Sequence, residues 1–271
     1  MDKIKKDFPQ FERQINGKPI VYLDSTATSL KPRCVIAAVN RYYTELCSNV
    51  HRGINAIAQE TDDLYEAARD TVAELVNAAP DEIVFVRNAT EGINLAAHML
   101  NLRKDDEVVC LLTEHHSNFL PWLDGASVRP VAPDRNGCVS VAAVLSAFTP
   151  RTKLVAIGHA SNVTGIVTPV AGIVEQARKK GVATLIDGAQ SVGHMPVNVR
   201  ALGCDFFAFS GHKMLGPSGI GALYVRNDIL KSAPPMILGG GMVLSVCTDR
   251  LEPESGPARL EAGPPHIEGA R

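Results

Sequence analysis

Short apolar runs alternate with longer amphipathic segments along this chain, and this alternation constrains the fold most strongly. The runs, bounded by Gly or polar residues, are predicted strands: Glu82–Val86, Glu107–Leu112, Lys153–Gly158, Val182–Ile186, Asp205–Phe209 and Ile220–Val225. Apolar residues at three- and four-residue spacing predict helices at Pro32–Cys47, Ala56–Asn77, Thr90–Leu102, Val139–Phe148 and Pro169–Lys180. Strands that alternate with helices predict right-handed βαβ units and a mainly parallel sheet covered on both faces.

The two ends of the chain differ from this pattern. Ile20–Leu23 is a candidate strand that leads into the polar loop Asp24–Ser29. The tail, Gly239–Arg271, is rich in Gly and Pro and is predicted to be loop. Because it follows a well-formed sheet and supplies no closing element, we expect that a further region is missing or comes from a partner.

Composition excludes several classes of function. Lys plus Arg number 27 and Asp plus Glu 29, a formal net charge of −2, which predicts no nucleic-acid partner and no membrane surface. The charged segment Met1–Gln10 does not resemble a signal peptide, and no apolar run is long enough to cross a membrane. The 6 cysteines form no CxxC pair, so we expect reduced thiols in the cytoplasm and no metal site.

Lys213 is the first candidate for chemistry. It follows the predicted strand Asp205–Phe209 within Ser210-Gly211-His212-Lys213. Ligands of open α/β sheets bind outside the carboxyl ends of the strands, where this amine would lie. A lysine there can form a Schiff base as a nucleophile, although a lysine taken alone is far more often a surface residue in a loop.

Polar residues follow other predicted strands in the same way. Asp187 ends a buried apolar strand, where a carboxylate needs a partner, and a cationic ring nitrogen would serve; the alternative is a helix cap. Thr90 is predicted to cap a helix whose start could hold an anion. His115 could stack on a flat ring or move a proton, and Asn162 could bind a ligand oxygen or cap a turn.

These residues lie in motifs that together resemble the class V aminotransferase family of fold-type I pyridoxal-phosphate (PLP) enzymes. The resemblance is closest to the group II cysteine desulfurases and selenocysteine lyases, and it runs from about Asp7 to Gly263. The motifs are Tyr22-Leu23-Asp24-Ser25, His51-Arg52-Gly53, Thr90-Glu91-Gly92-Ile93-Asn94, Glu114-His115-His116-Ser117-Asn118, Ser161-Asn162-Val163, Asp187-Gly188-Ala189-Gln190, Ser210-Gly211-His212-Lys213 and Gly216-Pro217-Ser218-Gly219-Ile220-Gly221.

The resemblance implies a fold and a domain organisation. The fold is the three-layer α/β/α large domain of fold-type I enzymes, with a mainly parallel mixed sheet and without the C-terminal small domain. Residues 1–20 belong with that small domain in the family. Residues 21–271 correspond to the PLP-binding large domain, incomplete at its C-terminal end.

The resemblance also implies roles for individual residues. Lys213 forms the Schiff base with pyridoxal 5′-phosphate and later moves the Cα proton of the substrate, and Asp187 keeps the pyridine nitrogen protonated. His115 stacks on the ring and Gln190 binds its phenolic oxygen. The phosphate is held by Thr90, Ser210 and His212. Asn162 lies near the substrate carboxylate, and His51 and Arg52 lie at the mouth of the site or at a dimer interface.

The implied function is cysteine desulfuration. L-cysteine, or a related amino acid, gives alanine and a persulfide on an enzyme cysteine, with the sulfur passing to an acceptor protein for iron–sulfur cluster assembly. The family is homodimeric.

This sequence departs from the family in two respects. The regions that carry the nucleophilic cysteine and a carboxylate-binding arginine have no counterpart, so this chain is expected to be inactive alone. Pro264 also replaces a threonine whose hydroxyl reaches the phosphate of the neighbouring subunit.

Three alternatives remain open. One is selenocysteine lyase or another class V lyase or aminotransferase, and one is a truncated, non-catalytic PLP-binding paralogue. A dehydrogenase is disfavoured because no GxGxxG follows the first strand.

Overall fold

A seven-stranded mixed sheet forms the centre of the computed structural model, which describes residues 2–51 and 53–271. Its strand order is β3-β9-β8-β7-β6-β4-β5, and β9 runs antiparallel to both of its neighbours while the remaining pairs are parallel. The strands of this sheet are β3 (Ile83–Val86), β4 (Glu107–Leu111), β5 (Ser127–Val131), β6 (Thr152–Gly158), β7 (Ala183–Asp187), β8 (Phe206–Ser210) and β9 (Gly221–Val225).

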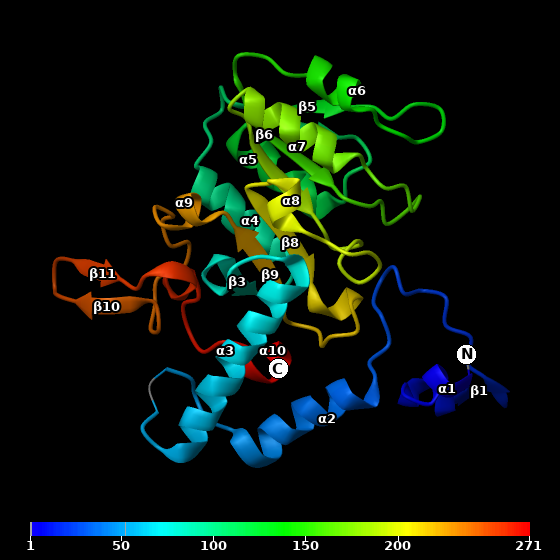
Figure 1. The fold of residues 1–271 in the computed structure, drawn as a ribbon, viewed down its shortest axis with the longest axis vertical. Coiled ribbons are helices and arrows are strands. Elements are labelled where there is room, and N and C mark those ends of the chain that lie inside the picture. The colour runs from blue at the N-terminus through cyan, green and yellow to red at the C-terminus, as the bar shows by residue number, and fades with distance from the viewer. Residues whose placement is uncertain (1, 52) are drawn as a thin grey trace.

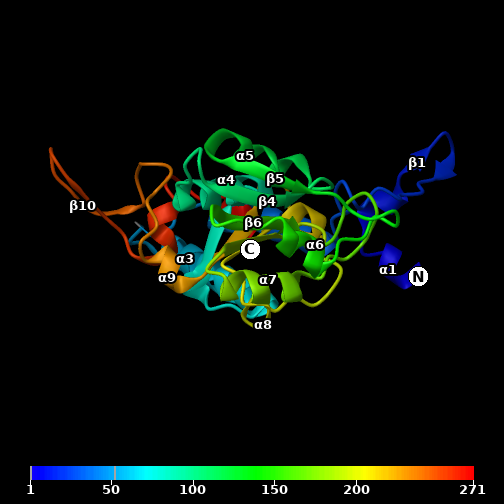
Figure 2. The same ribbon diagram turned by 90° about the horizontal axis from the view of Figure 1, so that it is seen from above.

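Helices cover both faces of this sheet, as Figure 2 shows from above. The α-helices are α1 (Asp2–Lys5), α2 (Arg33–Arg41), α3 (Ala56–Val76), α4 (Ala89–Leu100), α5 (Leu120–Gly125), α6 (Val141–Ser146), α7 (Val170–Lys179), α8 (Val199–Leu202), α9 (Asn227–Leu230) and α10 (Ile267–Ala270). Helices α4, α5 and α9 pack on one face, and α6, α7, α8 and the C-terminal end of α3 on the other. The predicted three-layer α/β/α fold is confirmed.

The strands of the sheet are continuous apolar runs because helices cover both of its faces. Every residue of Ile83–Val86 is buried, and so is every residue of Phe206–Ser210 and Gly221–Val225. Strands that are buried on both faces lack the polar alternation of surface strands, which explains why these runs are recognisable in the sequence. Strand β5 was not predicted, because it lies at the sheet edge and only Val131 of its residues is buried.

The helix boundaries follow from local chemistry. The side chain of Asn55 caps α3, and that of Asn88 caps α4 by accepting the Glu91 amide at 3.0 Å. The predicted Thr90 cap is therefore wrong, because the helix begins at Ala89, before Thr90. Helix α7 ends before Gly181, whose φ of 68° favours glycine as predicted.

The order of the strands creates a site at one place in the sheet. From β4 the chain moves to β5 on one side, and β6 then lies on the other side of β4. The connections after β4 and β6 thus diverge and leave a crevice between them at the carboxyl ends of these strands. Ligands of open α/β sheets bind at such a point.

Figure 1 shows the N-terminus at one side of the molecule, whereas the C-terminus follows α10, which packs against α2 and α3. Near the N-terminus, α1 is followed by the 3-10 turn Pro9–Glu12 and the hairpin of β1 (Gln14–Ile15) and β2 (Lys18–Pro19). Residues 20–23 form no strand, and Val21 and Leu23 are exposed, so the prediction of a strand there is wrong. The assignment of residues 1–20 to another domain remains a prediction.

The tail is more regular than the loop predicted for it. It contains the hairpin of β10 (Val243–Val246) and β11 (Leu251–Pro253), the 3-10 turn Gly256–Leu260 and helix α10. Its composition hid these elements because Gly and Pro occupy their boundaries. Leu244 and Val246 in the hairpin remain exposed.

Candidate active site

A cavity of about 450 Å³ lies at the carboxyl ends of the parallel strands. The segments that follow β3, β4, β6, β7 and β8 all reach it, and the polar loop Asp24–Ser29 contributes Asp24, Thr26 and Ala27. Every residue predicted to bind the cofactor lines this cavity: Thr90, His115, Asn162, Asp187, Gln190, Ser210, His212 and Lys213. Residues separated by more than a hundred positions in the sequence are thus brought to one place.

Lys213 enters the cavity from a 3-10 turn, Gly211–Lys213, that directly follows β8. The turn is held by the Met214 and Gly216 amides, which donate to the Gly211 carbonyl at 3.0 and 2.9 Å. The side chain is half-buried, and this burial lowers the pKa of Lys213 although Asp187 acts against the shift. A lowered pKa increases the fraction of neutral amine, which is the nucleophilic form.

Asp187 is the last residue of β7 and lies beside β8 in the sheet, opposite Gly158 of β6 and Ala208 of β8. The residue is buried, and its Oδ1 accepts the Ala189 amide at 2.9 Å. Burial raises the pKa of Asp187, and the Ala189 amide, Lys213 and His115 oppose this shift. None of the ion pairs among the described residues involves Asp187. Its carboxyl group therefore lines the cavity without a charged partner in direct contact.

The start of α4 forms one end of the cavity. The Ala89 amide donates to Ser210 Oγ at 2.8 Å, which joins this helix start to the end of β8. The hydroxyls of Thr90 and Ser117 lie 2.7 Å apart. The positive end of the helix dipole, together with these hydroxyls, favours an anion such as a phosphate.

His115 and Gln190 are oriented by backbone groups. The Ser117 amide donates to Nδ1 of His115 at 3.1 Å, so the ring hydrogen of the neutral form lies on Nε2. Nε2 of Gln190 donates to the Thr26 carbonyl at 2.9 Å and thereby ties the Asp24–Ser29 loop to the cavity. Gln190 thus reaches the cavity, and the second hydrogen of its amide nitrogen is left for a ligand.

Glu114 is a cavity residue for which the sequence suggested no role. Its Oε1 accepts the Gly158 amide at 2.8 Å, and its Oε2 accepts Nδ2 of Asn118 at 2.7 Å. Burial, reinforced by the charge of Asp187 and opposed by these bonds, raises the pKa of Glu114 to about 8. The signal was its position directly after an apolar strand, which is the argument that had singled out Asp187.

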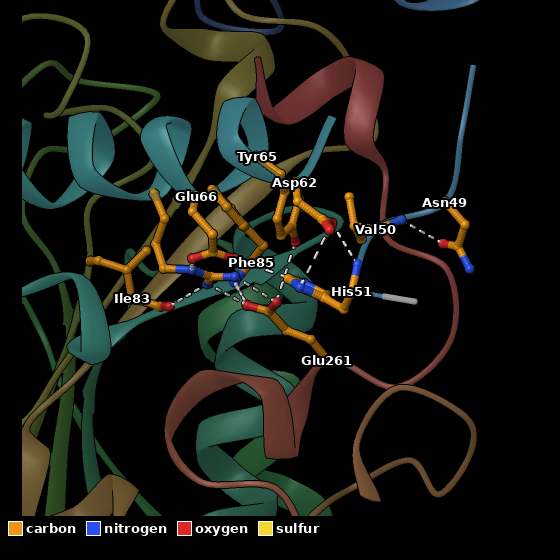
Figure 3. A network of polar contacts seen from close by, with 10 residues as sticks. Asn49, Val50, His51, Asp62, Tyr65, Glu66, Ile83, Phe85 and Glu261 are labelled. Atoms are coloured by element: carbon orange, nitrogen blue, oxygen red, sulfur yellow. Dashed lines mark hydrogen bonds and ion pairs between the residues drawn. The ribbon is translucent and has the colours of Figure 1, made fainter. Parts of the chain in front are cut away.

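His51 does not line the cavity. It lies beside Asp62, Tyr65 and Glu66 of α3 in the polar network of Figure 3, with φ 65°, and its place at a dimer interface stays a prediction. Its Nδ1 and Nε2 are 3.9 and 3.7 Å from Asp62 and Glu66. The prediction for Arg52 falls outside the described residues. Pro264 also lies away from the cavity around Lys213, at a second hollow shared with His51.

The cysteines of the chain are all free. Cys110 and Cys204 are buried, and burial raises the pKa of both thiols. The other four, Cys34, Cys47, Cys138 and Cys247, are exposed, and within the described ranges no cysteine lines the cavity. Residues 2–51 and 53–271 contain no group of three or more His, Cys, Asp or Glu side chains arranged for a metal ion. No helix in that part of the chain is long and apolar enough to cross a membrane.

Known proteins show the same architecture. The model of the class-V aminotransferase family matches residues 21–271. A cysteine desulfurase of Synechococcus elongatus is 41% identical over 277 residues, covering 99% of this chain and 44% of that protein. A probable cysteine desulfurase of Halalkalibacterium halodurans is 43% identical over 277 residues, covering 99% of this chain and 68% of that protein.

One solved structure matches nearly the whole chain. It is the apo cysteine desulfurase of Thermococcus onnurineus NA1, with a TM-score of 0.92 and 36% identity, and the match covers 99% of this chain and 68% of the other. The chain thus spans less than half of one curated relative and about two thirds of the other two proteins.

Proposed function

Because the chain belongs to the class-V aminotransferase family, we propose that its cavity holds pyridoxal 5′-phosphate for a cysteine desulfurase reaction on L-cysteine. The family uses this cofactor, which when bound supplies an aldehyde carbon for an amine and a ring that accepts electrons. Lys213 would hold the aldehyde carbon and Asp187 the ring nitrogen. Thr90, Ser210 and His212 would hold the phosphate, and His115 and Gln190 the ring.

One observation carries this proposal: Lys213 and Asp187 leave adjacent strands, β8 and β7, into the same cavity. The buried Asp187 carboxyl has one hydrogen bond from the protein and no ion pair among the described residues, so a cationic ring N–H would stabilise it. The hydroxyl-rich start of α4 lies at the same cavity and suits a phosphate. The donors and acceptors present fit the cofactor.

Lys213 is also suited to move a proton. Its amine is held in a half-buried position where burial lowers the pKa, which favours the neutral form that accepts a proton. Asp187 counteracts this shift from within the same cavity. Asn162 lies on the opposite loop, after β6, where its amide can bind a substrate carboxylate.

The thiol that accepts the sulfur is not one of the described residues that line the cavity, because none of these residues is a cysteine. We therefore expect this 271-residue chain to release little sulfide from L-cysteine by itself. In the proposed full reaction a thiol outside the cavity wall attacks the substrate sulfur. The bond between that sulfur and Cβ breaks, and the carbon side keeps the electron pair and takes up a proton, which leaves alanine and an enzyme persulfide. The sulfur would then pass to an acceptor protein for iron–sulfur cluster assembly.

The remaining parts of the proposal concern the assembly and location of the protein. We propose a homodimer in the cytoplasm. The exposed apolar side chains of Leu244 and Val246 on the β10–β11 hairpin support a subunit contact, because clustered exposed apolar residues commonly mark such contacts.

Borohydride trapping tests the proposal. The protein is incubated with pyridoxal phosphate, reduced with borohydride and digested, and the modified peptide is identified by mass spectrometry. We expect the label on Lys213 and its loss in Lys213→Ala, while the exposed Lys180→Ala serves as the matched control and keeps the label. An adduct that persists in Lys213→Ala would contradict the proposal that Lys213 forms the Schiff base.

Substrate assays separate the alternatives. Alanine formation from L-selenocysteine without formation from L-cysteine would identify a selenocysteine lyase. A labelled Lys213 without turnover of any amino acid, even after addition of an external thiol, would identify a non-catalytic PLP-binding protein. Rapid sulfide release that depends on one of the chain's own cysteines would contradict our view of the acceptor thiol.

A further inference from the structure

The backbone carbonyl of His212 lies at the centre of an unusual set of donors. It accepts hydrogen bonds from the Ser29 amide at 2.9 Å, from Thr28 Oγ1 and Ser29 Oγ at 3.0 Å each, and from Lys31 Nζ at 2.8 Å. A carbonyl oxygen has two lone pairs, so these four donors share it. All of them come from one short segment far away in the sequence.

This carbonyl is part of the peptide group that links His212 to Lys213. Because the peptide is planar, fixing the oxygen of His212 also fixes the direction of the Lys213 amide and thus the position of its Cα. The bonds within the 3-10 turn use the Gly211 carbonyl instead. The donors of residues 28–31 therefore supply the contact that orients the base of the Lys213 side chain.

The residues after Lys213 are held by the same segment. The Leu215 amide donates to Ser29 Oγ at 2.8 Å, and Leu215 has φ 70°, a conformation that a residue with a branched side chain adopts only where its surroundings enforce it. On another side of the turn, a Cβ added to Gly193 would lie 3.0 Å from the Lys213 carbonyl oxygen. The turn is thus confined from two directions.

Among the four donors to the His212 carbonyl, Lys31 makes the strongest hydrogen bond because its donor is charged. Its ammonium group also donates to the Ser29 carbonyl at 2.7 Å, and burial lowers its pKa. Placing this cation against two carbonyls costs solvation, which the hydrogen bonds offset. A charge-assisted hydrogen bond is roughly twice as strong as a neutral one, so loss of Lys31 should have a larger effect than loss of a hydroxyl.

From this geometry we infer that Thr28, Ser29 and Lys31 are positioning residues that hold Lys213 at the cavity through the His212 carbonyl. The inference rests on the proposed function, because it gives Lys213 a reacting partner. The loop that carries these residues also reaches the cavity through Thr26, whose carbonyl accepts Gln190 Nε2. One segment before α2 thus orients groups that follow both β7 and β8.

Amide hydrogen exchange in the cofactor-free protein provides the first test. In Lys31→Met we expect exchange of the Lys213–Leu215 amides to be about 10-fold faster or more, since a hydrogen bond from a charged group is stronger than one between neutral groups. Lys31→Arg, which retains the cation and its donors, should stay within about threefold of the wild type. Lys18→Met makes the same chemical change at an exposed position in β2 and should alter nothing at residues 213–215.

The rate of adduct formation at Lys213 provides the second test. With pyridoxal phosphate and borohydride trapping, Lys31→Met should form the adduct about 10-fold more slowly, and Lys31→Arg should restore most of the rate. Thr28→Val should slow it by less, because three donors remain. Equal rates and equal local exchange in Lys31→Met and Lys18→Met would overturn the inference, as would faster exchange spread evenly over the whole chain.

The two tests separate this inference from the proposed function. If the wild type forms no trappable adduct, the proposed function fails, and hydrogen exchange still decides whether Lys31 orders the turn. If the wild type forms the adduct and Lys31→Met forms it equally fast, the function stands and the positioning role is wrong.

Discussion

Two buried polar clusters in this protein use their charged groups in different ways. In the network of Figure 3, where Glu261 and Ile83 are labelled, the guanidinium of Arg69 donates to both oxygens of Glu261 at 2.7 and 2.9 Å and to the Ile83 carbonyl at 2.8 Å. Glu261 also accepts the Phe85 amide at 2.7 Å and the Tyr65 hydroxyl at 3.2 Å. In the cavity, the Asp187 carboxyl accepts one amide, and Lys213 lies in no described ion pair.

The difference shows how structural and functional burial can be told apart. Arg69 and Glu261 satisfy each other, so their cluster joins α3, β3 and the C-terminal segment without needing a ligand. Interaction with Glu261 raises the pKa of Arg69 despite the opposing effect of burial. Lys213 and Asp187 both have pKa values displaced toward their neutral forms, mainly by burial. Buried ionisable groups without a partner in the protein are stabilised most when a ligand supplies one, and such groups are typical of functional sites.

Arg69→Met should cause the largest effect. It leaves the buried Glu261 carboxylate without its cation, which costs roughly 3–5 kcal/mol of unfolding free energy, measured by urea denaturation. Lys179→Met, in the exposed pair with Glu175, should leave the free energy of unfolding nearly unchanged. A loss below about 1 kcal/mol for Arg69→Met would contradict a structural role for the network.

Asp187→Asn should give the opposite pattern. It should weaken pyridoxal phosphate binding, measured by absorbance titration, by about 10- to 100-fold through loss of a charged hydrogen bond. Because the pKa of Asp187 is raised in the folded protein, its charge opposes folding at pH 7, so the cofactor-free variant should be at least as stable as the wild type. Reduced stability with unchanged binding would make Asp187 a structural residue.

Glu114→Gln should change the pH dependence of stability. The folded pKa of Glu114 is about 8 against 4.5 for the free side chain, so the folded state retains a proton that the unfolded state releases between these values. The stability from this group is complete below about pH 4.5 and is lost as the pH rises to about 8, at roughly 1.4 kcal/mol per pH unit. Denaturation at several pH values should show that Glu114→Gln removes this slope.

His51→Asn should have the smallest effect. Asn tolerates the positive φ of this position, and the side chain of His51 is half-exposed beside Asp62 and Glu66. We expect a change in unfolding free energy below about 1 kcal/mol and unchanged labelling of Lys213. Loss of labelling would place His51 in the functional site after all.

Much of the fold was predictable because strands buried on both faces are apolar throughout. The runs before Lys213 and Asp187 were recognised for this reason. Strand β5 at the sheet edge and the β10–β11 hairpin carry weaker patterns, and they were missed. The expected strand at Ile20–Leu23 failed because an apolar run forms a strand only where a neighbouring strand pairs with it.

The sequence by itself determined which side chains follow the apolar strands, and so identified Lys213, Asp187 and His115 together as candidates. Only the tertiary structure decided that His51 lies beside Asp62 of α3, that Asn88 rather than Thr90 caps α4, and that Lys31 contacts the turn bearing Lys213. The physical reason is that strand periodicity and polarity are local properties, whereas the His212 carbonyl and the residues 28–31 meet only when the sheet brings distant segments together.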